Sequence, residues 1–208
     1  VQDLQYVAAS SGRQGLSTRP AAAPLAAAPA PPAPPAPAPA PSNATTVKLW
    51  PVSDSYVNAA APNANYGTSS ALASRGTSGY VSYLRFALPN PPPGKRLTGA
   101  ALRVYTRGVS YAGSNDVHYV HLNPSTWSSR TVTWNTRPAL QPSVLGKFTG
   151  ATELNNFHYA TLNVAPLQTL QGANRTFAIR SSGTDNLWLW SGNSSVTWKR
   201  PRLILTYR

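Results

Sequence analysis

The prolines of this chain divide it into two parts with different folding options. Ten of the 21 prolines lie within residues 20–41, together with eleven alanines and Leu25. Proline fixes φ and has no backbone N–H to donate, so neither a continuous helix nor a central strand can form there. The tract therefore predicts an arm in the polyproline II conformation, which at about 3.1 Å per residue would reach on the order of 70 Å.

Residues 1–19 precede this arm, and VQDLQYVAA alternates in the manner of a short strand. A single strand is not stable alone, so it is either a frayed terminus or a strand donated to the sheet of another subunit. In the second interpretation the arm is an interaction element, and in the first it is a linker or cell-wall spacer. The chain starts without Met, which leads us to expect processing of a longer precursor. The assembly contacts of the second interpretation would come from Val1, Leu4, Tyr6 and Val7.

The sequence pattern of residues 46–208 predicts an all-β domain. This domain follows the Pro/Ala-rich arm, which we place at residues 20–45. Apolar and β-branched runs recur between Gly, Pro, Asn and Ser, and only 164–172 suggests a short helical turn. So many short strands favour an antiparallel jelly-roll β-sandwich, which also protects its sheet edges. The expected strands lie within 46–52, 55–59, 70–75, 80–88, 99–108, 116–122, 132–135, 143–148, 157–164, 176–182, 187–191 and 202–208.

Composition excludes most catalytic chemistry. The chain has no Cys and only five Asp and Glu residues, which removes thiol nucleophiles, disulfides and Cys-ligated metals and nearly excludes a carboxylate-based hydrolase. Two of its three His residues, His118 and His121, would lie on opposite faces of one strand and could not share a metal. We therefore expect no enzyme, no metal and no cofactor; a polysaccharide lyase would lack a visible base.

The net charge of +13 instead indicates a binding role. The basic residues are spread over many strands, and no nucleic-acid-binding motif occurs, so nucleic acid is not the expected partner. No segment is suited to spanning a membrane. Arg outnumbers Lys, and its planar fork suits carboxylates and sulfates, so an acidic polysaccharide is the better partner; the alternative is that these arginines only solvate strand faces.

Aromatic residues suggest where such a ligand would bind. In LWLW the leucines are the natural core pair, which leaves Trp188 and Trp190 to form an outward aromatic shelf suited to sugar stacking. With Arg180 they are the predicted carbohydrate-binding residues. We expect Trp127 and Trp134, by contrast, to anchor the core or its rim, and Arg137 to hold a loop by hydrogen bonding to carbonyl groups.

The longest motifs carry a resemblance. VSDSYVNAAAPNANYGTSSAL (52–72), SYLRFALPNPPPGKRLTGAALRVYT (82–106), TWSSRTVTWNTRPAL (126–140), FAIRSS (177–182) and RPRLILTY (200–207) resemble, in order and spacing, the DNRLRE family of secreted jelly-roll domains. Some of those domains bind carbohydrate, so the resemblance implies a binding module of extracellular or cell-surface proteins. Family members often carry Ser-x-Glu near the penultimate strand, where this chain has Asn193.

Covalent glycans are a further expectation. The motif N-x-[ST] occurs at Asn43, Asn174 and Asn193. The Ala-Pro tract also resembles the hydroxyproline-rich glycoproteins of plant and algal cell walls, which implies modification of Pro31, Pro32, Pro34 and Pro35.

Two functions remain from the sequence. The first is a structural subunit of an extracellular glycoprotein fibril, in which the N-terminal strand and the arm dock on neighbouring copies, head to tail. The second is a secreted carbohydrate-binding module that recognises an acidic polysaccharide. We prefer the first, on the basis of the apolar N-terminal strand, the long arm and the lack of catalytic groups.

Overall fold

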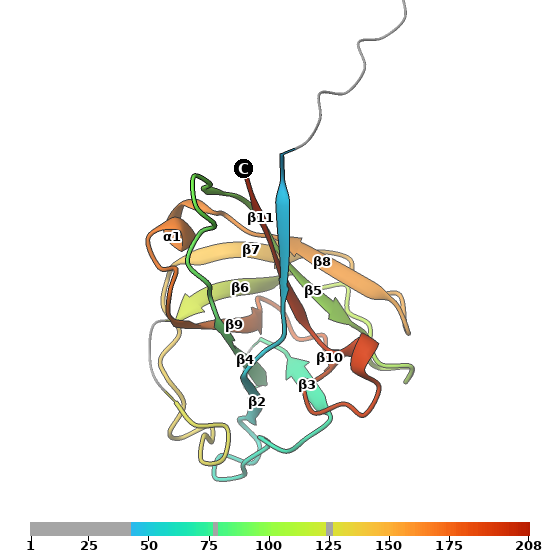
Figure 1. Cartoon of the computed structure of the whole chain (residues 1–208). Coiled ribbons are helices and arrows are strands. Elements are labelled where there is room, and N and C mark those ends of the chain that lie inside the picture. Colours follow the sequence, from blue (N-terminus) through green and yellow to red (C-terminus); the bar gives the residue numbers. More distant parts are fainter. Residues whose placement is uncertain (1–42, 77–78, 124–126) are drawn as a thin grey trace, which may run out of the picture. The chain divides into compact units, whose positions relative to one another are not determined.

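A computed structural model describes residues 43–76, 79–123 and 127–208, and strands predominate there (Figure 1). The predicted N-terminal strand and the polyproline II arm lie outside these residues. The elements are β1 (Thr45–Leu49), β2 (Ser53–Asn58), β3 (Ala71–Ser74), β4 (Tyr80–Ala87), β5 (Leu97–Tyr105), β6 (His118–Asn123), β7 (Val144–Phe148), β8 (Phe157–Thr161), α1 (Ala165–Gln168), β9 (Asn174–Ser181), β10 (Leu187–Trp190), a 3₁₀ turn at Thr197–Lys199 and β11 (Arg202–Tyr207).

The strands form an antiparallel jelly-roll β-sandwich, as the sequence predicted. One sheet has the order β1-β11-β5-β8, the other has the order β2-β4-β9-β6-β7, and β10 pairs with β3 in a short third sheet. Every strand pair is antiparallel. The first strand and the last pair with each other, so the two ends of the domain are joined in one sheet.

Alternating side chains from both sheets build the core between them. In β5, Leu102 and Val104 are fully buried while Arg103 is half-buried on the opposite face. In β9, Phe177 and Ile179 point into the same core, so Arg180 points outward. The largest fully buried side chains of this core are Leu72, Leu84, Phe86, Leu97, Leu102, Phe148, Leu167, Phe177, Ile179, Leu187 and Tyr207.

A second apolar cluster lies on the outer face of the five-stranded sheet. Val57, Val81, Tyr83 and Ala178 supply its strand side, and Val132 covers them from the connection between β6 and β7. Residues 132–135, expected as a strand, therefore belong to a connecting segment. Their apolar residues cover a sheet face instead of pairing in a sheet. The alternation of apolar residues in the sequence is the same in both cases, so it does not distinguish them.

Candidate functional site

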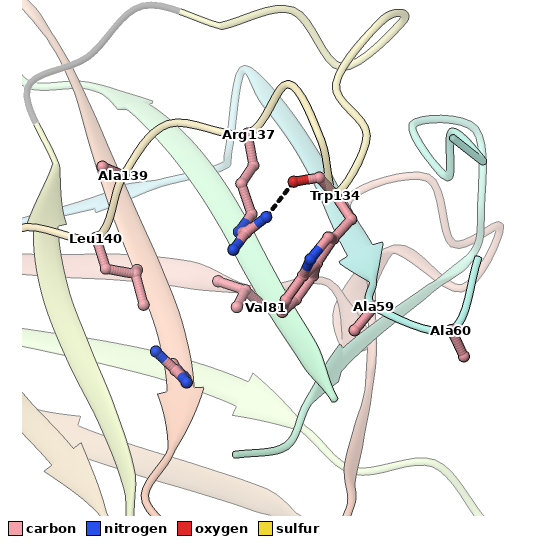
Figure 2. Close-up of a pocket in the computed structure, with 8 residues that line it drawn as sticks. Ala59, Ala60, Val81, Trp134, Arg137, Ala139 and Leu140 are labelled. Carbon is pink, nitrogen blue, oxygen red and sulfur yellow. Dashed lines mark hydrogen bonds between the residues drawn. The ribbon is translucent and has the colours of Figure 1, made fainter. Parts of the chain in front are cut away.

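A groove of about 840 Å³ lies on the outer face of the five-stranded sheet, where the 127–141 segment crosses it. Figure 2 shows Trp134 and Arg137 of this segment side by side, with the chain then continuing to Leu140. The floor includes Val81 of β4 and Arg180 of β9, whose side chains point away from the core. The groove is lined by Ala59, Ala60, Val81, Trp134, Arg137, Ala139, Leu140 and Arg180.

The start of the 127–141 segment is fixed by the Asn-Tyr-Gly motif between β2 and β3. The Asn65 Nδ2 group donates to the carbonyls of Ser129 (2.8 Å) and Val132 (2.7 Å). A Cβ added to Gly67 would lie 1.8 Å from the Ser129 carbonyl oxygen, so only glycine permits this approach. Two sequence motifs that lie far apart in the chain thus form one structural unit beside the groove.

The end of the segment is fixed by side chains of the sheet. The Tyr83 hydroxyl donates to the Pro138 carbonyl oxygen at 2.9 Å. Asn123 donates to the Ala139 carbonyl at 3.1 Å and accepts from the Gln141 N–H at 2.9 Å. Because both ends are tied by hydrogen bonds to other parts of the domain, the side chains between them are held in position over the sheet.

Trp134 and Arg137 form a stacked pair. The Arg137 guanidinium carbon lies 3.7 Å from the centre of the Trp134 ring, and its Nη1 group donates to the Trp134 carbonyl. Arg180 lies opposite Tyr119 in the sheet, and Tyr119 lies opposite Lys147. The groove and the strand face beside it therefore present cations and aromatic rings together.

The positive charges of the groove affect the pKa values of two neighbouring groups, Tyr83 and His121. Burial raises the pKa of the Tyr83 hydroxyl to about 12, and the positive charges of Arg137 and Arg180 act in the opposite direction. Burial lowers the pKa of His121; its hydrogen bond to the Gln141 carbonyl opposes this shift, and the Arg180 charge adds to it. Both guanidinium groups thus act on the same stretch of the sheet.

The described carboxylates are all engaged away from the groove. Asp54 accepts from the Gly192 N–H at 2.5 Å, and Asp116 accepts from the Asp185 N–H at 2.6 Å. Asp185 in turn accepts from the Asn115 N–H, and Glu153 accepts from the Asn156 side chain. The cations of the groove are therefore available to an anionic ligand.

The predicted site residues do not form one site. Trp188 is half-buried and lines a separate pocket of about 110 Å³ with Arg107, Val109 and Tyr111, whereas Arg180 lines the groove. The Trp188 ring packs edge-on against Tyr56 at 5.8 Å and near Tyr80 at 5.2 Å. Through these contacts Trp188 packs against the main core, so part of its surface is already covered.

Trp190 has a different environment from Trp188. Two cations lie near its ring: the Arg107 guanidinium carbon is 4.8 Å and the Lys199 Nζ atom 5.0 Å from the ring centre. Its buried Nε1 atom has no hydrogen-bond partner among the described residues. Leu187 and Leu189 are fully buried, so the alternation expected for this strand is present.

The three predicted acceptors of Asn-linked glycans all have exposed side chains. Asn43 precedes β1, and Asn174 begins β9. The Nδ2 atom of Asn193, however, donates to the carbonyls of Gly67 (3.0 Å) and Ser69 (3.2 Å). A glycan would be attached to that same nitrogen, so modification of the folded domain there would disturb both bonds.

The remaining predicted site residues lie outside the described part of the chain. These are the assembly residues Val1, Leu4, Tyr6 and Val7 and the modified prolines Pro31, Pro32, Pro34 and Pro35.

Histidine residues do not converge on a reaction centre. His118 is fully buried between the hydroxyls of Ser74 and Ser114, each 2.8 Å from a ring nitrogen, whereas His121 is on the outer face. Within residues 43–76, 79–123 and 127–208, no three His, Asp or Glu side chains form a cluster that could hold a metal. The helices of this part are all too short to cross a membrane.

Sequence reasoning underrated Trp134 and Arg137. Arg137 does hold a carbonyl of its own loop, and Trp134 does pack on the outer apolar cluster, as structural anchors would. Both also line the groove. The sequence does contain a signal for this pair, because Arg137 follows Trp134 by three residues in a segment bounded by prolines. At this spacing the two side chains can stack only if the loop turns back on itself.

An antiparallel β-sandwich with an arginine- and tryptophan-lined groove on one sheet face has the form of a sugar-binding domain. The family model of carbohydrate-binding module family 96 matches residues 45–207, and the chain belongs to this family. Such modules bind carbohydrate without transforming it, so the described domain is a non-catalytic binding domain. A comparison with curated proteins gave no match.

Proposed function

We propose that the domain binds an acidic polysaccharide in the groove, through Arg137, Arg180 and Trp134. The observation that supports this most directly is the pair of guanidinium groups in a groove that no described carboxylate neutralises. A guanidinium group binds a carboxylate or sulfate through two parallel hydrogen bonds. A uronic acid or a sulfated sugar presents both the anion and an apolar ring face to such a surface.

The rigidity of the groove favours binding of a flexible polymer. Arg137 is stacked on Trp134 and hydrogen-bonded to its carbonyl, so little side-chain freedom is lost when a ligand binds. Leu140, which is half-buried, supplies an apolar lining for the C–H face of a sugar ring.

The binding interpretation takes precedence over the fibril subunit that we preferred from the sequence. Membership of a carbohydrate-binding family favours it, whereas assembly depends on Val1–Val7 and the arm, which lie outside the described residues. In our proposal the whole protein is extracellular and the segment 20–45 serves as a spacer for the domain at 46–208. The DNRLRE resemblance remains consistent with such a secreted module.

Removal of either groove arginine should weaken binding to polygalacturonate by about 10- to 100-fold, the value of a hydrogen bond to a charged group. We would measure Arg137→Ala and Arg180→Ala by affinity electrophoresis, with neutral dextran as the control polymer. Arg130→Ala is the matched control, because Arg130 is an exposed arginine of the same segment that does not line the groove. It should leave binding unchanged.

Salt provides a second measurement of the same proposal. Raising the ionic strength from about 0.02 M to about 0.5 M should weaken binding strongly, since exposed charges are then screened within a few ångströms. Equal losses in Arg180→Ala and Arg130→Ala, or binding to dextran as strong as to polygalacturonate, would show that the groove does not recognise the anion.

A further inference from the structure

The outer face of the four-stranded sheet holds a second group of cations and aromatic rings. Arg202 of β11 lies directly opposite Arg103 of β5, which in turn lies opposite Tyr159 of β8. The neighbouring side chains Leu203 and Leu102 point into the core, so the arginines point outward. We call this surface the arginine–aromatic face: Trp50, Arg103, Tyr159, Trp198, Lys199 and Arg202.

The arginine pair is the most unusual feature of this face. Like charges directly opposite each other in a sheet are destabilising, and a nearby carboxylate would normally offset them. The four described carboxylates are engaged elsewhere, as shown above. Burial and the charge of Arg202 both lower the pKa of Arg103, whereas its hydrogen bond with Tyr159 acts in the opposite direction. The Nε atoms of both arginines are buried without a partner among the described residues.

Stacking holds these cations in place without neutralising them. The Arg202 guanidinium carbon lies 3.9 Å from the centre of the Trp50 ring, and that of Arg103 lies 4.3 Å from the centre of the Phe157 ring. Arg103 also donates to the Trp198 carbonyl at 3.2 Å. The guanidinium planes are thus fixed in orientation while their charge remains to be satisfied.

Three large rings of the face are exposed. Tyr159 is 56% exposed, Trp198 50% and Trp50 42%, and the Lys199 ammonium lies 5.2 Å from the Trp198 ring centre. Exposed aromatic rings gathered on one sheet face are typical of a binding site rather than of a solvated face. Because positive charge accompanies the rings, the ligand should combine an anionic group with an apolar ring face.

We propose that the arginine–aromatic face is a second binding site for an anionic glycan. This inference rests on the proposed function, because the second surface would bind the same class of ligand that we propose for the groove. The groove belongs to the outer face of one sheet and this face to the outer face of the other, so the two sites lie on opposite sides of the sandwich. One domain can therefore hold two glycan strands and link them.

The number of binding sites per chain tests this inference. Oligogalacturonate and a chondroitin sulfate oligosaccharide are titrated calorimetrically into the full chain, which should bind two molecules of at least one of them. The double variant Tyr159→Ala with Trp50→Ala should bind one molecule, in the groove. The double variant Arg137→Ala with Arg180→Ala should also bind one molecule, on the arginine–aromatic face. The combination of all four changes should abolish binding. Tyr111→Ala, an exposed tyrosine outside both surfaces, is the matched control.

Cross-linking gives an independent measurement. The unchanged chain should increase light scattering of long polygalacturonate at substoichiometric protein, and either double variant should lose at least nine-tenths of that increase. If the unchanged chain binds one molecule, and only the groove variants abolish this binding, the second site is overturned and the proposed function remains intact. Loss of all binding in the face variants alone would overturn the groove assignment instead, and no binding to either glycan would overturn both.

The Pro-rich segment of this same chain is the competing occupant, since aromatic surfaces also bind polyproline II helices. A synthetic peptide of residues 20–41 is therefore added to the full chain and to the face variants. We expect no binding and no displacement of the oligosaccharide. Peptide binding that disappears in Tyr159→Ala with Trp50→Ala would assign the face to the arm and overturn the glycan proposal.

Discussion

Gly67→Ala should destabilise the domain by about 3 kcal/mol and should also weaken glycan binding. The new methyl carbon would lie 1.8 Å from the carbonyl oxygen of Ser129 and 2.5 Å from its carbonyl carbon. These are backbone atoms, so the 127–141 segment would have to move as a unit, at a cost at the upper end for overpacked sites. Because Trp134 and Arg137 are carried by that segment, the groove would change with it.

Urea unfolding followed by tryptophan fluorescence would measure the change in free energy. Gly99→Ala is the matched control, because the Cβ there would lie 3.3 Å from the Cβ of Thr206, a contact that a local shift of a few tenths of an ångström relieves. Its cost should stay below about 1 kcal/mol. Equal stabilities of the two variants would mean that the loop is not held at Gly67.

A glycine after Asn-Tyr usually indicates a tight turn, in which glycine often adopts positive φ. Among the residues that the structure describes, positive φ occurs at Asn155, Gly94, Gly150 and Gly172, so Gly67 is required for another reason. Its missing side chain admits a carbonyl from a segment more than 60 positions away. Contacts of this kind depend on tertiary structure and leave no local signal in the sequence.

The strand pattern was the most predictable part of the fold. Eleven of the twelve expected runs contain a strand, and the turn expected within 164–172 is α1. Alternation succeeds there because one face of each sheet packs on a common core. It failed at 132–135, where Val132 and Trp134 cover a sheet from outside.

The site was less predictable than the fold. Arg180, Trp188 and Trp190 were predicted as one carbohydrate-binding site, and each is at least partly exposed. Alternation says which face of a strand a residue occupies, but the order of strands in the sheets decides which residues meet. Arg180 belongs to the outer face of β9, whereas the tryptophans belong to the short β10–β3 sheet.

Two buried ionisable groups should give the domain opposing pH dependences in the same interval. Asp54 is 5% exposed, and burial raises its pKa from 3.8 to about 6, against the Gly192 N–H and the charge of Arg200. Between about pH 4 and 6 the folded state therefore binds more protons than the unfolded state. The stability due to Asp54 falls with rising pH by about 3 kcal/mol across this interval.

His118 has the opposite sign. Burial lowers its pKa from 6.5 to about 4, although Asp116 and Asp185 act in the other direction. Between about pH 4 and 6.5 it is the unfolded state that binds more protons, so stability falls by about 3 kcal/mol as pH drops through this range. In the unchanged protein the two contributions largely cancel.

Substitution of one group at a time should reveal the other. Asp54→Asn, whose side-chain oxygen can still accept the Gly192 N–H, should give a domain that gains about 3 kcal/mol of stability from pH 4 to 6.5. His118→Asn should lose stability over the same rise in pH. It will also lose hydrogen bonds to Ser74 and Ser114, so the slope with pH is the quantity to compare.

The measurement is urea unfolding at several pH values between about 4 and 7, and the double variant is the internal control. With both groups removed, the dependence on pH should flatten again, because neither term remains. An Asp54→Asn curve parallel to that of the unchanged protein would mean that the carboxyl group ionises normally in the folded state. A parallel His118→Asn curve would mean that the imidazole is protonated as readily inside the core as in water.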